Sequence, residues 1–133
     1  TVSVLYWLSP TTMLEKVFWW SAFLAPLPSI ALYALTPAGT VQHFNGEPSP
    51  TASFWCSVTA SGDAYVAWMA LMVLLNFHDT KLKKMVLRGN WIYSVLHFGA
   101  FWFWHRHGAA HPNPAMYPVA LAIATAGLVA WGL

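Results

Sequence analysis

Two long apolar runs separated by a short basic segment constrain the fold of this chain most strongly. The runs are about Phe54–Phe77 and Met85–Trp104, and each is near the length that a helix needs to cross a bilayer core of roughly 30 Å. Between them lies His78–Lys84, HDTKLKK, which holds three lysines. The pattern predicts a helical hairpin that crosses a membrane twice and has its turn in water.

The composition favours a membrane protein over a soluble one. Of 133 residues, 58% are hydrophobic and 8% are charged, whereas soluble domains carry roughly 25% charged residues. Further apolar runs at about Met13–Leu35 and Tyr117–Leu133 bring the predicted spans to four. Pro26 and Pro28 interrupt the first run, and since proline lacks a backbone donor and clashes with the preceding turn, we expect a kink there. We therefore predict one domain over residues 1–133, an all-α polytopic membrane protein with four transmembrane helices.

The distribution of positive charge predicts the orientation of these spans. Thr36–Ser53 and His105–Met116 lie between spans on one side of the membrane, and the first is dense in Pro, Gly, Ser and Thr, which predicts a surface loop. Only Arg106 falls on that side. Five basic residues fall on the other side, with the termini: Lys16, Lys81, Lys83, Lys84 and Arg88. The positive-inside rule then places the termini and the Lys81–Arg88 turn in the cytoplasm, stroma or matrix.

Each arm of the hairpin carries an ionisable residue at depth. Asp63 and His97 lie about 13 Å and about 10 Å from the same end of their spans, at 1.5 Å per residue. An Asp at a helix centre costs about 2.5–3.5 kcal/mol on insertion scales, so it should face the bundle and have a partner. We predict an Asp63–His97 pair that acts as a polar clasp between two helices. A proton relay or a substrate-binding carboxylate is the alternative interpretation.

His97 is also the first candidate for a cofactor ligand. A neutral imidazole nitrogen can bind the magnesium of chlorophyll or the iron of haem. Gly99 and Ala100 leave room beside it, and the neighbouring aromatic residues offer flat apolar surface. No second histidine lies at mid-membrane depth, which argues against haem with two histidine ligands. His78, at the other end of the second span, is the second candidate. One ring nitrogen of His97 could bind the metal while the other donates a hydrogen bond to Asp63, as in many metal-bound histidines.

Other groups of polar residues have simpler interpretations. Four histidines fall on the side of the two long loops: His43, His105, His107 and His111. Four such residues are enough to bind zinc or copper, but their spacing in the sequence fits no structural zinc pattern. The basic Lys81–Arg88 segment either binds anionic lipid headgroups or only orients the chain. A net charge of +2 is too small to indicate nucleic acid as a partner. Enzyme motifs are absent, so we predict that the protein is not an enzyme.

The whole-chain pattern resembles small nuclear-encoded accessory membrane subunits of algal photosystem supercomplexes. The resemblance is carried by several aromatic-rich spans, the isolated histidines His97 and His78, and a loop, Thr36–Ser53, suited to lying against neighbours. It implies a chloroplast thylakoid location with the basic turn in the stroma. It also implies chlorophyll, carotenoid or lipid as cofactors, and other membrane subunits and membrane lipids as partners. Excitation transfer would belong to the pigments, and the protein would supply ligands and spacing.

Two alternatives stay open at this point. The first is a pigment-free accessory subunit of a respiratory complex. The second is a small sterol- or quinone-handling membrane enzyme or scaffold built around Asp63 and His97, because four short spans with few charges also resemble DoxX-like families and small endoplasmic-reticulum scaffolds of sterol enzymes. The Asp63 and His97 placement is similar to that of acidic and histidine residues in the emopamil-binding sterol isomerases.

Overall fold

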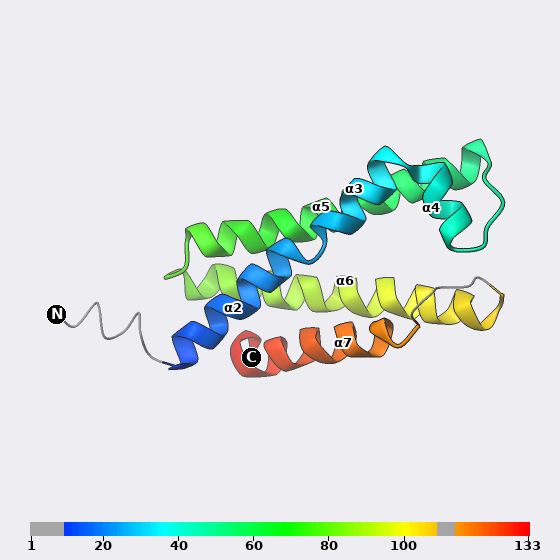
Figure 1. Ribbon diagram of the computed structural model, residues 1–133. Helices are drawn as coiled ribbons and strands as arrows, with labels where there is room; N and C mark the ends of the chain where they lie inside the picture. Colours follow the sequence, from blue (N-terminus) through cyan, green and yellow to red (C-terminus); the bar gives the residue numbers. More distant parts are fainter. Residues whose placement is uncertain (1–9, 109–113) are drawn as a thin grey trace.

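The fold is entirely helical in the residues that the structure, a computed structural model, describes: 10–108 and 114–133. Figure 1 shows the elements in order along the chain. They are α2 (Pro10–Leu24), α3 (Leu27–Leu35), α4 (Pro37–His43), α5 (Pro50–Leu75), α6 (Thr80–Arg106), α7 (Met116–Gly127) and a final π-helical turn, η1 (Leu128–Gly132). The predicted all-α class is confirmed.

The predicted kink in the first apolar run is present as a break between two helices. α2 ends at Leu24, and α3 begins at Leu27. Neither Pro26 nor Pro28 can donate a backbone hydrogen bond, so the helical ladder is interrupted at both positions. The Pro26 carbonyl still accepts from the Ile30 amide at 2.9 Å, which lets the chain continue as helix directly after the break.

The interpretation of Thr36–Ser53 as a plain loop is wrong, because this segment contains the short helix α4. Its proline stands in the first turn, where its missing N–H costs nothing. The buried Thr40 hydroxyl lies within hydrogen-bond distance of two carbonyl oxygens. One belongs to Leu32 of α3, at 3.0 Å, and the other to Thr36, the C-cap residue of α3, at 2.9 Å. Seven residues are too few to show a helical hydrophobic period, so the sequence pattern did not reveal this helix.

The two long helices of the hairpin begin earlier than the apolar runs predict, because polar side chains cap them. The Ser49 side chain accepts from the Ala52 amide at 3.1 Å, and Asp79 Oδ1 accepts from the Leu82 amide at 3.0 Å. Both are favourable N-cap residues. The segment His78–Lys84 is therefore only partly a turn, since α6 already includes its last five residues.

The helices form two layers. α2 and α3 pack along α5, whereas α7 and η1 pack along α6 (Figure 1). The start of α2, the connection between α5 and α6, and the end of η1 lie at one end of the molecule, which we call the turn end. α4, the start of α5 and the end of α6 lie at the opposite end, which we call the loop end. This up-and-down order agrees with the predicted order of the four apolar runs.

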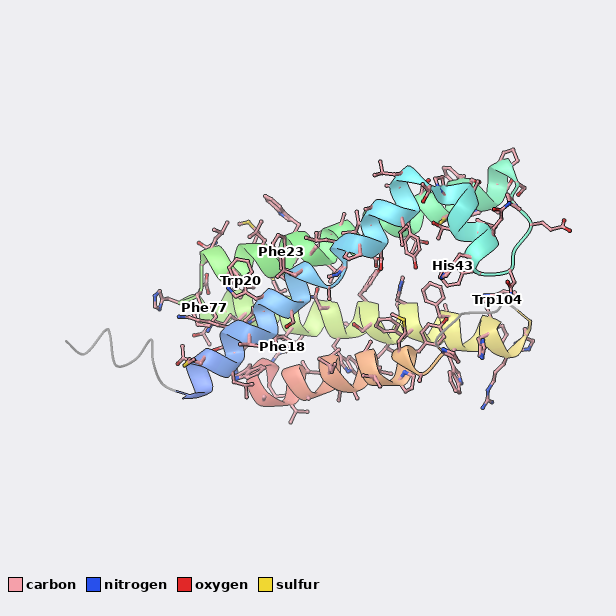
Figure 2. The ribbon with its side chains drawn as sticks, viewed as in Figure 1. Phe18, Trp20, Phe23, His43, Phe77 and Trp104 are labelled. Carbon is pink, nitrogen blue, oxygen red and sulfur yellow. The ribbon has the colours of Figure 1, made fainter. Side chains whose placement is uncertain are left out.

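The buried core is small and lies at the turn end. It is formed by Trp19, Ala70, Val73, Phe77, Val86 and Leu87. Figure 2 shows Phe77 at this end, together with the aromatic side chains Phe18, Trp20 and Phe23 of α2. Large apolar side chains elsewhere are mostly exposed, on both layers: Trp68 is 57% exposed, Leu96 69% and Ile123 57%.

Among the described residues, two helical stretches are long and apolar enough to cross a bilayer. They are Thr12–Leu35, which joins α2 and α3, and Pro50–Leu75, which is α5. Met116–Gly132 is also apolar but shorter. α6 has 27 residues, and its basic, histidine and aromatic residues make it less apolar than α5.

Candidate functional site: a polar cluster between α5 and α6

Asp63 lies in the interior of the hairpin and has a tyrosine as its closest polar partner. The residue is 9% exposed. The Tyr93 hydroxyl of α6 donates a hydrogen bond of 2.7 Å to Asp63 Oδ1. A carboxylate that accepts such a bond is partly compensated for its loss of water. Nothing in the apolar pattern of the chain singled out Tyr93 beforehand.

The structure also brings Asp63 and His97 together. His97 Nε2 lies 3.9 Å from the same Oδ1 atom, which is ion-pair range but beyond a hydrogen bond. Tyr93 and His97 are four residues apart on α6 and so share one face, and their rings stack with centroids 5.0 Å apart. The two α6 side chains thus approach one carboxylate oxygen of α5.

A glycine beside Asp63 makes room for this arrangement. A Cβ atom at Gly62 would lie 3.0 Å from the Tyr93 hydroxyl oxygen and 3.3 Å from its Cε2 atom. Such distances are tighter than normal van der Waals contact, so an alanine there would displace the tyrosine ring. Gly62 therefore allows α5 to approach the Tyr93 side chain closely.

A series of aromatic contacts extends from the cluster to α3 and α7. Phe101 of α6 contacts His97 edge-on at 4.8 Å between centroids and stacks on Phe44 at 6.0 Å and on Tyr117 of α7 at 5.5 Å. Tyr33 of α3 lies 6.4 Å from Phe44 between ring centroids. These rings connect the two layers on the loop-end side of the cluster.

The two predicted pigment ligands occupy very different places. The His97 side chain is only 16% exposed, and its Nε2 atom faces the carboxylate of Asp63. His78 is exposed and lies in the connection between α5 and α6, at the turn end. Chlorophyll binding by either residue stays a prediction.

The loop-end histidines do not form a metal site among the described residues. His43 ends α4, and His105 and His107 lie at the end of α6; Figure 2 shows His43 and Trp104 at this end. His107 Nδ1 is 2.8 Å from the Phe103 carbonyl oxygen. No group of three or more His, Cys, Asp or Glu side chains within the described ranges is arranged to hold a metal ion. His111 lies outside the described residues.

Basic side chains at the turn end bind groups of the protein itself. Lys83 Nζ lies 2.8 Å from Glu15 Oε1 of α2 and 3.9 Å from the centre of the Phe77 ring. Lys84 Nζ donates to the Leu133 carbonyl at 2.7 Å. Arg88 Nε donates to the Gly132 carbonyl at 3.0 Å. Cations are favourable at the carbonyl end of a helix, so these residues fasten α2 and η1 to the first turns of α6.

An apolar groove of about 260 Å³ lies between α6 and α7. Its lining is made of Phe98, Gly99, Trp102, Tyr117, Pro118 and Leu121. A Cβ atom at Gly99 would meet nothing within 4 Å, so this glycine opens the groove. His97, which precedes this segment, does not line it.

Comparison of the chain with protein-family models, curated proteins and solved structures finds no match.

Proposed function

We propose that this protein is a four-span membrane protein that serves as an accessory subunit of a larger membrane assembly and has no catalytic activity of its own. The observation that carries the proposal is the exposure of large apolar side chains along both layers. On α5 alone, Trp55 is 62% exposed, Trp68 57% and Leu75 70%. Apolar surface of this extent marks contact with lipid or with other proteins.

The arrangement of the helices supports four spans. α2 with α3, α5, α6, and α7 with η1 run between the turn end and the loop end in alternating directions (Figure 1). α6, with 27 residues, extends about 40 Å at 1.5 Å per residue, which is more than the bilayer core. Its polar residues Tyr93 and His97 turn toward Asp63 and away from lipid. The 17 residues of Met116–Gly132 are at the lower limit for a span.

The polar cluster supports a structural role over a catalytic one. The Asp63 carboxylate is engaged by Tyr93 and His97, and aromatic rings pack around the two α6 side chains. We interpret the cluster as a clasp that fixes α5 against α6. A subunit with a small core needs such a clasp to keep its two layers in register while its outer faces contact neighbours.

We further propose, from the resemblance to algal photosystem subunits, that the assembly is a photosystem and that the basic turn faces the stroma. Chlorophyll would then bind at His97 or His78, with carotenoid or lipid on the apolar faces. At His97, the metal would use Nδ1, because Nε2 faces Asp63. The absorption spectrum of the purified protein should show the blue and red chlorophyll bands. A spectrum without these bands would contradict the photosystem proposal and favour an accessory subunit of a respiratory complex, which needs no pigment.

Native gel electrophoresis tests the accessory role. Membranes that contain the tagged chain are solubilised in a mild detergent, and the tag is followed on the gel. We expect it to migrate with a large assembly and to stay in the membrane pellet after extraction at alkaline pH. Migration as a stable monomer would contradict the accessory role, and release by alkali would contradict the membrane location.

A sterol- or quinone-handling enzyme or scaffold is the second candidate, and the meeting of Asp63, Tyr93 and His97 within one interior cluster favours it. An Asp63→Asn variant distinguishes the two. An accessory subunit with this substitution loses stability or assembly. An enzyme with this substitution still assembles, but the cells that depend on it lose turnover of a sterol or quinone.

A further inference from the structure

We propose that the groove between α6 and α7 binds an acyl chain of an anionic membrane lipid and that Arg106 holds the lipid phosphate. The inference rests on the proposed membrane location and goes beyond it, because it assigns a ligand class to one site. The groove and the guanidinium belong to consecutive turns of the same helix, since Trp102 lines the groove and Arg106 lies four residues further along α6.

The size and lining of the groove suit a linear apolar chain. Its volume of about 260 Å³ is below the roughly 300–1,000 Å³ of sites for drug-sized ligands, so a macrocycle does not fit inside it. Phe98 and Trp102 form one wall and Tyr117 and Leu121 the other. Gly99 leaves the space between them open.

Charge at the end of the groove indicates an anionic headgroup. The Arg106 guanidinium carbon lies 5.1 Å from the centre of the Trp102 ring, so the cation stands over one of the groove residues. Among the described residues, Arg106 is the one Lys or Arg at the loop end. Within the described ranges its guanidinium forms no ion pair with a carboxylate, in contrast to Lys83 at the turn end. Arginine next to apolar surface at a membrane boundary is a typical site for a phosphate-bearing lipid.

Native mass spectrometry of the full chain, released from nanodiscs, tests the proposal. The nanodiscs contain equal amounts of phosphatidylglycerol and phosphatidylcholine with the same acyl chains. We expect one retained lipid per chain, with phosphatidylglycerol favoured about fivefold. Both lipids carry a phosphate, but the choline cation of phosphatidylcholine cancels its charge, and the attraction of one basic side chain to a net anionic headgroup supplies about this preference. Soluble glycerol phosphate should not displace it, because the acyl chain contributes to binding.

Two matched pairs of variants locate the site. Gly99→Leu fills the groove and should abolish retention, whereas Gly89→Leu introduces the same side chain on α6 at a position that is equally open and should not. Arg106→Gln should bring the two lipids to parity. Lys81→Gln removes a positive charge at the turn end and should leave the preference unchanged.

Several outcomes would overturn the proposal. Equal retention by the Gly99→Leu and Gly89→Leu variants would show that the lipid binds elsewhere. Equal binding of both lipids by the unmodified chain would show that the groove holds an acyl chain with no preference for an anionic headgroup. Displacement by glycerol phosphate would show a soluble phosphate site. A protein that resists alkaline extraction but gives any of these results refutes only the lipid site, whereas a protein that alkali releases refutes the membrane location as well.

Discussion

The Tyr93 hydroxyl donates its hydrogen bond to Asp63 Oδ1 across the interface between α5 and α6. This contact joins the two layers of the molecule near the middle of its long helices. An aspartate in an apolar helix is tolerated only with a partner, and here a neutral hydroxyl at 2.7 Å is closer than the imidazole at 3.9 Å. In the clasp that we propose, Tyr93 is therefore the closer partner of Asp63 and His97 the more distant one.

Replacing Tyr93 by phenylalanine should destabilise the protein by about 1 kcal/mol, as interhelical hydrogen bonds in membrane proteins do. Phenylalanine keeps the ring that stacks on His97 and removes only the donor to Asp63. The measurement is the free energy of unfolding in detergent micelles. Tyr65→Phe is the control, because Tyr65 lies on α5 and is 62% exposed. Equal stability of the two variants would show that the hydroxyl contributes nothing.

The glycines of the hairpin should respond in opposite directions to alanine. Gly89→Ala should stabilise α6 by roughly 0.5–1 kcal/mol, because alanine has less backbone entropy to lose and a Cβ atom there meets nothing within 4 Å. Gly62→Ala should instead destabilise the protein by about 1 kcal/mol, because its Cβ atom pushes Tyr93 away from Asp63. Thermal unfolding of both variants measures the difference. Stabilisation by both would mean that the Tyr93 ring moves at no cost.

The long helices and their order could be predicted from the sequence, because apolar runs of membrane length and a basic turn determine them. The break at Pro26 and Pro28 was predictable for a covalent reason, the missing backbone donor. The short helix α4 was not predictable, because its seven residues hold two of the Pro and Gly positions that usually indicate a loop. The Pro and Gly content of the segment therefore indicated a loop, and seven residues are too few to show a helical pattern against it.

The candidate site was predictable only in part. Depth along each span brought Asp63 and His97 to the same level, and the structure places them 3.9 Å apart. Tyr93 was missed because tyrosine is common in membrane helices, and its contact depends on the rotation of α6 about its axis. Its spacing of four residues from His97 was the available signal. The partners of Lys83 and Lys84 were also unpredictable, because they lie on helices distant in the sequence.

The ion pair between Glu15 and Lys83 should show a measurable coupling energy. The side chains are only 13% and 11% exposed, at 2.8 Å, so the pair should exceed a typical surface salt bridge and reach about 1 kcal/mol. A double-mutant cycle with Glu15→Gln and Lys83→Gln, read from unfolding free energies at low salt, isolates this term. Lys81→Gln paired with Glu15→Gln is the control and should show no coupling. A coupling of zero for the first cycle would show that the lysine is held by Phe77 alone.

The four-span topology predicts which side of the membrane each connection faces. In a chain whose native Cys56 is replaced by alanine, single cysteines are introduced by Lys81→Cys, Glu47→Cys and His107→Cys. All three positions are exposed. Position 81 lies at the turn end, and positions 47 and 107 lie at the loop end. In bacterial cells that carry the chain in their plasma membrane, a membrane-impermeant maleimide should label Glu47→Cys and His107→Cys from the outside of the intact cells. It should label Lys81→Cys only after the membrane is opened, since basic turns stay on the inner side. Labelling of Lys81→Cys and Glu47→Cys from the same side would exclude α5 as a span, and labelling of His107→Cys from the inner side with Lys81→Cys would exclude α6.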